Sequence, residues 1–175
     1  LRKGEADRAL SLFGSILNSG WFADKKLALH QYFPVMLSDI ALCHAVRGNL
    51  DAAEEWQGYA HDHFPPGKAS ATLFLDTLIA VRRGRYETAL KDAQARWSDA
   101  EGTLLGFQMK ILNALLAFAC SRINKNGEHD EKIRELIAAS KPYRAEQHGG
   151  LMAHWPEYRE FLMQQGIAPQ VLIAG

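Results

Sequence analysis

The chain has 175 residues, of which 47% are hydrophobic, and its 20 Lys and Arg residues balance its 20 Asp and Glu residues. This composition is typical of one globular domain and is too apolar for a disordered chain. Because there is no basic excess, direct binding to nucleic acid is not expected. No apolar stretch approaches the roughly 20 residues that a bilayer-spanning helix needs, so no membrane span is predicted.

The two cysteines, Cys43 and Cys120, both lie in apolar stretches with helical periodicity. Two cysteines are too few for a disulfide scaffold. A free cysteine in such a stretch behaves as a small hydrophobic residue. We therefore predict reduced thiols and a cytoplasmic protein.

The first predicted helix covers residues 5–18. Residues 1–4, Leu-Arg-Lys-Gly, resemble the end of a preceding helix, and the sequence does not begin with Met. Without a hairpin partner, the helix would expose an apolar face, which proteins seldom leave uncovered. We therefore expect residues 1–23 to be an incomplete first repeat and the chain to be a fragment of a longer protein.

Four glycines mark a recurring turn, at spacings of 44, 36 and 43 residues: Gly4, Gly48, Gly84 and Gly127. A glycine can end a helix in the left-handed conformation that costs other residues energy. After each of the first three, an alanine follows five residues later, which lets the next helix pack closely. The pattern predicts a single domain of helical hairpins over 1–175, with repeats at 24–67, 70–103 and 104–145 and a closing helix and tail at 150–175.

Apolar residues at helical spacing predict the helices around these turns. A long helix is expected over 25–47, with a kink or a restart at Pro34. Later helices are expected over 104–123, 130–145 and 155–165, which gives about seven to eight helices in an all-α chain. Gly149-Gly150, next to His148 and His154, is interpreted as a flexible connector, with a small polar site as the alternative.

The repeats resemble the tetratricopeptide repeat family. The copy over 34–67 carries the family's signature residues, which here are Leu37, Ile40, Ala41, Gly48, Leu50, Ala53, Ala60 and Pro65. The copy over 70–103 matches at Leu73, Gly84, Tyr86 and Ala89. It departs at Asp76, where a large apolar residue is usual, and at Arg96, where a small one is usual. The resemblance implies a right-handed solenoid of antiparallel helix hairpins.

The resemblance also implies that the inner helices line a concave groove for a partner. By register, nine residues would face this groove: Val35, Ser38, Leu42, Phe74, Leu78, Arg82, Ala117, Ser121 and Asn124. Some family members hold a peptide carboxylate with a Lys/Asn/Arg clamp. That clamp is not matched here, because Arg82 is the one basic residue of the set.

Few residue patterns in this sequence suggest chemistry. His61 and His63 are one residue apart and do not share a helix face, whereas a metal site needs three or four converging ligands. The acid pair Glu157 and Glu160 is expected on a solvated face, and no nucleotide-binding or hydrolase motif occurs. We therefore predict no metal, no cofactor and no catalytic residue.

Two groups of aromatic residues on the predicted helices are candidates for packing or for binding. Four sit on outer helices, where helical spacing favours packing over ligand binding: Trp56, Tyr59, Tyr86 and Trp97. Phe74 and Phe107 are the aromatic candidates for a binding surface.

The predicted function is a protein-interaction scaffold that holds a peptide or helix of a protein partner in its groove. The alternative is a ligand-sensing domain of a larger bacterial signalling or transcriptional regulator, which a closed pocket rather than an open groove would favour. The apolar tail is expected to pack on the last hairpin, on the groove or on a second copy of the chain, through Ile167, Val171, Leu172 and Ile173.

Overall fold

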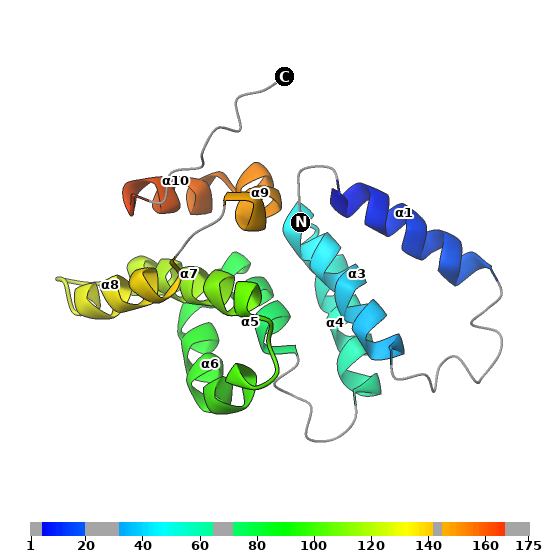
Figure 1. Cartoon of the computed structure of the whole chain (residues 1–175), viewed down its shortest axis with the longest axis horizontal. Helices are drawn as coiled ribbons and strands as arrows, with labels where there is room; N and C mark the ends of the chain where they lie inside the picture. Colours follow the sequence, from blue (N-terminus) through cyan, green and yellow to red (C-terminus); the bar gives the residue numbers. More distant parts are fainter. Residues whose placement is uncertain (1–4, 20–31, 65–71, 142–144, 167–175) are drawn as a thin grey trace.

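The computed structural model of the chain describes residues 5–19, 32–64, 72–141 and 145–166. These residues form nine α-helices and no strand (Figure 1). In chain order the helices are α1 (Glu5–Asn18), α3 (Phe33–Arg47), α4 (Leu50–His63), α5 (Leu73–Arg82), α6 (Tyr86–Glu101), α7 (Gly106–Ile123), α8 (Asp130–Ala139), α9 (Ala145–His154) and α10 (Pro156–Gln164).

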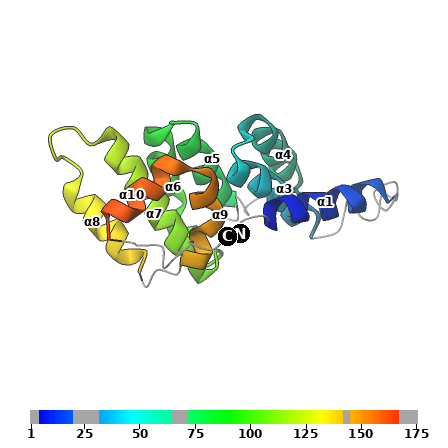
Figure 2. The same cartoon turned by 90° about the horizontal axis from the view of Figure 1, so that it is seen from above.

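The helices pack as consecutive pairs. Helix α3 packs on α4, α5 on α6 and α7 on α8, while α5 also contacts α3, α4 and α7. Figure 2 shows these pairs following one another along the molecule, with α1 beyond α3 at one end. The predicted all-α class is therefore observed in the described residues. The right-handed solenoid of the tetratricopeptide family stays a prediction.

Gly48 ends α3 as the sequence predicts. Its φ is +87°, and the Gly48 N–H donates to the Ala45 carbonyl at 3.2 Å. The structure adds a second requirement, because a Cβ built at Gly48 would lie 3.3 Å from Nη2 of Arg82. The glycine therefore both turns the chain and makes room for a guanidinium from the next hairpin.

Two predicted helices differ in length from those observed. Helix α3 begins at Phe33 with Pro34 in its first turn, which agrees with a restart at that proline. Residues 25–31 lie outside the described residues. Helix α8 ends at Ala139 rather than reaching residue 145, and the hydroxyl of the buried Ser140 donates to the Ile137 carbonyl at 2.7 Å.

The predicted connector around Gly149-Gly150 is wrong. Residues 145–154 form α9, which packs on α3, α7 and α10 and buries Leu151 and Met152. A helical glycine costs about 1 kcal/mol relative to alanine. Burial of an apolar side chain contributes about 1.5–3 kcal/mol, so the packing of this face outweighs the two glycines.

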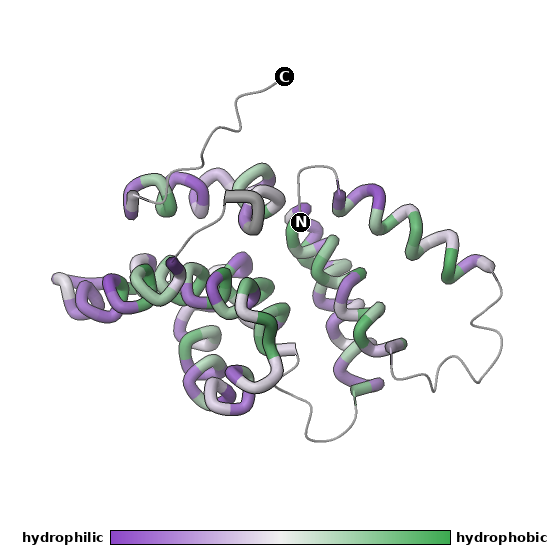
Figure 3. Tube along the Cα trace, viewed as in Figure 1, coloured by the Kyte–Doolittle hydropathy of each residue, from purple (hydrophilic) through white to green (hydrophobic). Residues whose placement is uncertain are grey.

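Buried residues are most numerous in α5 and α7, which pass through the middle of the molecule. Helix α5 buries eight of its ten residues and α7 ten of eighteen, so both are apolar on more than one face (Figure 3). Neighbouring pairs lie on either side of them, and α9 and α10 lie across them (Figure 1). Cys43 and Cys120 are buried free thiols, as predicted. In the described part of the chain, no helix is both long and apolar enough to cross a bilayer.

His148 is fully buried in α9, where its Nδ1 lies 3.2 Å from the Tyr158 hydroxyl and the two rings stack. Burial lowers the pKa of His148 from 6.5 to about 3. The unfolded chain therefore takes up a proton on this residue as the pH falls below 6.5, while the folded chain does not until about 3.

We therefore expect the stability that His148 contributes to be lost as the pH falls from 6.5 toward 3. The loss should be about 1.4 kcal/mol per pH unit. Urea unfolding at about pH 7 and about pH 4.5 measures it as a difference of about 3 kcal/mol. The variant His148→Gln should show a flatter dependence, whereas His154→Gln, at an exposed position in the same helix, should keep the wild-type slope. Parallel curves for wild type and His148→Gln would contradict this.

Candidate functional site

Three of the predicted groove residues belong to the core instead. Phe74 is 6% exposed, and Leu78 and Ala117 are fully buried, in one cluster with residues of α9 and α10. The prediction that these three residues face an open groove is therefore corrected, because their side chains are packed in the core. In the folded chain these three side chains offer no surface to a partner.

Arg82, the basic residue of the predicted groove, is a link between helices. Its Nη1 donates to the Ala45 carbonyl and, at 2.8 Å, to the Val46 carbonyl, both at the end of α3. Its Nη2 donates to the His154 carbonyl at the end of α9, also at 2.8 Å. The last carbonyls of a helix lack partners within that helix. Arg82 therefore supplies donors to two helix ends at once, and its guanidinium lies 4.9 Å from the centre of the Trp155 ring.

The three predicted groove residues on α3 are partly exposed but do not lie in the cleft between α7, α8 and α10. Val35 is 44% exposed, and Ser38 and Leu42 are half-buried. None of the three lines the cleft described next.

A cleft of about 850 Å³ lies between α7, α8 and α10. Two predicted groove residues, Ser121 and Asn124, line it. The others are Phe118, Arg122, Asp130, Ile133, Arg134, Glu157, Glu160, Phe161, Gln164 and Gln165. Nine of these twelve residues are polar or charged, so the cleft is a polar surface with a small apolar floor.

Helical spacing builds one wall of the cleft. Glu157, Glu160, Phe161 and Gln164 recur at intervals of three and four residues and so share one face of α10. Phe161 is 7% exposed, and its ring lies 5.4 Å from that of Phe118 on α7. This contact holds α10 on α7 and leaves the two carboxylates at the rim.

The turn between α7 and α8 builds the opposite wall. Nδ2 of Asn124 donates to a carboxylate oxygen of Asp130 at 2.7 Å, and Oδ1 of Asn124 accepts from the His129 N–H at 2.9 Å. These bonds span the turn and begin α8 at a defined angle. Asn124 therefore shapes the wall, which leaves less of its hydrogen-bonding capacity for a ligand.

The α7–α8 wall of the cleft carries a net positive charge, from Arg122 and Arg134 against Asp130, and the α10 wall carries negative charge from Glu157 and Glu160. Arg122 lies over the Phe118 ring at 5.8 Å, and Nε of Arg134 donates to the Asp130 carbonyl at 3.3 Å. Among the described residues, no ion pair links either guanidinium to Glu157 or Glu160. A ligand with both signs of charge would therefore find complementary groups on both sides.

A second polar cluster lies between α4, α5 and α6, around the carboxylate of Asp76. It accepts hydrogen bonds from Gln57 at 2.6 Å, Thr72 at 2.8 Å and Arg96 at 2.7 Å, and lies 3.0 Å from Nε2 of His61. Burial would raise the pKa of Asp76, but these hydrogen bonds outweigh burial and hold the pKa below its usual value. The two departures from the repeat pattern, Asp76 and Arg96, are therefore partners of each other.

The Asp76 cluster is a structural link rather than a binding site, because its own donors surround the carboxylate. The hydrogen bond to Asp76 raises the pKa of His61. His63 instead contacts the Tyr59 carbonyl at 2.7 Å and the edge of the Phe33 ring. In the ranges that the structure describes, no three potential metal ligands come together.

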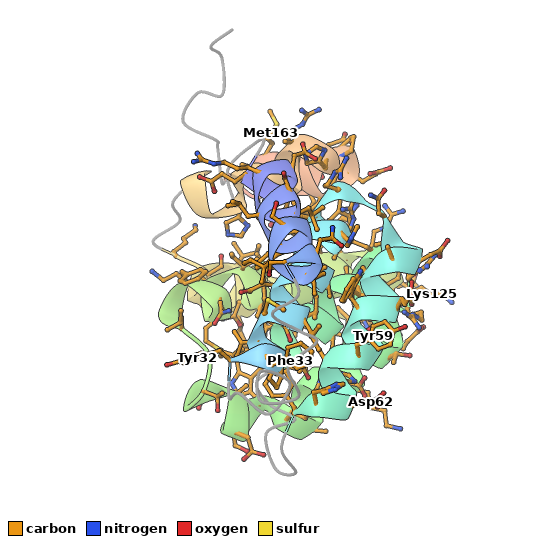
Figure 4. The ribbon with its side chains drawn as sticks, turned by 90° about the vertical axis from the view of Figure 1, so that its right-hand side faces the viewer. Tyr32, Phe33, Tyr59, Asp62, Lys125 and Met163 are labelled. Atoms are coloured by element: carbon orange, nitrogen blue, oxygen red, sulfur yellow. The ribbon has the colours of Figure 1, made fainter. Side chains whose placement is uncertain are left out.

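Exposed apolar side chains do not gather around one site. Figure 4 shows Tyr32, Tyr59 and Met163 well apart from one another. Phe107 is 43% exposed in the first turn of α7, while Trp56, Tyr86 and Trp97 pack against the core. The mixed-charge cleft is therefore the candidate functional site.

Comparison with protein-family models, curated proteins and solved structures returned no match. The tetratricopeptide resemblance therefore stays a prediction made from the residues.

Sequence reasoning assigned Ser121 and Asn124 to a groove lined by inner helices and missed the α10 wall beside which the structure places them. Glu157, Glu160 and Gln164 share one helix face, and that spacing was the available signal. The spacing alone could not show which residues lie opposite this face of α10, because that depends on how α10 packs against α7.

Proposed function

We propose that the protein is an interaction scaffold and that it holds a segment of a partner polypeptide in the cleft between α7, α8 and α10. The observation that carries the proposal is an open cleft with opposite charges on its two walls and no ion pair between them in the described residues. A tetratricopeptide-type solenoid is the architecture that we propose for this scaffold.

The composition of the cleft favours a peptide over a small ligand. Pockets for small molecules are mostly apolar and enclose most of the ligand. This cleft is open and mostly polar, and its Gln164 and Gln165 amides can bond to a peptide backbone. The same argument favours a scaffold over a ligand-sensing domain.

The cleft also sets the kind of affinity to expect. Apolar burial contributes about 25 cal/mol per Å² before the cost of ordering the peptide. The floor offers three apolar side chains, Phe118, Ile133 and Phe161, and all three are already buried. Charged groups add specificity and speed of association more than affinity. Binding should therefore be of the order of micromolar and should weaken as salt rises.

The test is selection from a random-peptide library displayed on phage, using the immobilised chain. Selected peptides are then measured against Glu160→Arg, which reverses a charge on the α10 wall, and against Glu55→Arg. Glu55 is an exposed glutamate on α4, away from the cleft, so it controls for net charge. We expect Glu160→Arg to weaken binding about ten-fold and Glu55→Arg to change it little. Peptides that bind both variants equally, or no enriched peptide, would reject the proposal.

A further inference from the structure

A smaller depression of about 300 Å³ adjoins the cleft and extends it toward Gly48. The two hollows share three lining residues, Phe118, Arg122 and Glu157. A segment bound in the cleft could therefore reach the depression with one side chain. Arg82 and Trp155 also line the depression.

The charges in this depression differ from those of the main cleft. Two guanidiniums, of Arg82 and Arg122, line it against the single carboxylate of Glu157, which leaves a net positive charge. Each guanidinium lies over an aromatic ring, Arg82 over Trp155 at 4.9 Å and Arg122 over Phe118 at 5.8 Å. A guanidinium on a ring face keeps its N–H groups pointing outward from its edge, where an acceptor can meet them.

Both arginines keep donors available. A guanidinium has five N–H groups. Arg82 makes three hydrogen bonds, to the carbonyls of Ala45, Val46 and His154, and so retains further N–H groups. The exposed Arg122 has no hydrogen bond or ion pair with another described residue. Gly48 adds no side chain to the rim, so nothing projects over Arg82 from that side.

We propose that the depression is an anion subsite, in which Arg82 and Arg122 together hold a carboxylate or phosphoryl group of the bound segment. This inference rests on the proposed function and deepens it, because it names the chemistry that anchors the segment. Planar N–H groups bind such oxyanions through paired, charge-assisted hydrogen bonds. Glu157 offsets one of the two positive charges and so favours a single anionic group.

The test follows the Nε–H signals of the arginines by NMR in the full ¹⁵N-labelled chain. Sodium acetate and sodium phosphate are titrated separately at constant ionic strength, with chloride as the balancing anion. We expect saturable shifts of the Arg82 and Arg122 signals, with no such shift at Arg134. The anion that saturates at the lower concentration identifies the group, carboxylate or phosphoryl.

Two matched variants make the result specific. Arg122→Gln should weaken the anion response about ten-fold. Arg134→Gln, which changes an arginine of the main cleft that does not line the depression, should leave it unchanged. Shifts that grow linearly without saturating, or an equal loss in both variants, would overturn the subsite. Library peptides that still lose affinity to Glu160→Arg but not to Arg122→Gln would reject the subsite while leaving the proposed function in place.

Discussion

Replacing Asp76 with alanine is expected to destabilise the fold by about 2–3 kcal/mol, because it removes one partner of a partly buried charged pair and leaves the other. The Asp76 side chain is 13% exposed and that of Arg96 is 23% exposed, at an Nη2–Oδ2 distance of 2.7 Å. Gln57, His61 and Thr72 would lose the same acceptor. Urea unfolding, followed by helical circular dichroism, measures the change.

The double variant Asp76→Leu/Arg96→Ala should recover most of this loss. It replaces the pair with the large apolar and small residues that the repeat pattern expects, and a buried ion pair replaced by apolar residues is often neutral or stabilising. We expect the double variant to unfold within about 1 kcal/mol of wild type. A double variant as unstable as the sum of the two single changes would show that the cluster is not organised around this pair.

The pH dependence of the same cluster follows from its two titrating groups. The pKa of His61 is raised above 6.5, so its contribution is present below 6.5 and is lost as the pH rises through the folded-state pKa. The pKa of Asp76 is lowered below 3.8, so its contribution is present above 3.8 and is lost as the pH falls through the folded-state pKa. The penalty of Asp76→Ala should therefore be larger at about pH 5.5 than at about pH 8.

Replacing Arg82 with alanine is expected to cost about 2–4 kcal/mol and to loosen α9 and α10 first. The guanidinium joins the end of α3 to the end of α9, and its loss removes a donor from the Val46 and His154 carbonyls. The Ala45 carbonyl also loses this donor but still accepts from the Gly48 N–H. Arg82→Lys should not restore stability, because one ammonium group cannot donate to the carbonyls of both helix ends as the planar guanidinium does. Hydrogen exchange should show faster opening of α9 and α10 than of α5.

Arg83 provides the control for this prediction. It is the next residue, but it pairs with Asp51 and Glu54 at the surface, where ion pairs are screened by solvent. Arg83→Ala should leave the exchange of α9 and α10 unchanged. If Arg82→Ala and Arg83→Ala behaved alike, Arg82 would not be the link between these helices.

Local sequence signals determined the helices and the turns of the hairpins. Gly48, Gly84 and Gly127 all have positive φ, between 75° and 87°, where the recurring pattern placed them. A left-handed glycine and a 3.6-residue periodicity are properties of short segments, so they can be predicted without the rest of the fold. The predicted turn at Gly4 and the tail from Ile167 to Ile173 lie outside the described residues.

Tertiary structure alone decided which of these helices meet and where the surface lies. It made α9 a helix despite Gly149-Gly150, covered Phe74 and Leu78, paired Asp76 with Arg96 and set the charged face of α10 opposite Arg122. The residues in each of these contacts are far apart in the chain. The periodicity of one helix shows that it has a buried face, but the partner of that face depends on how every other helix packs.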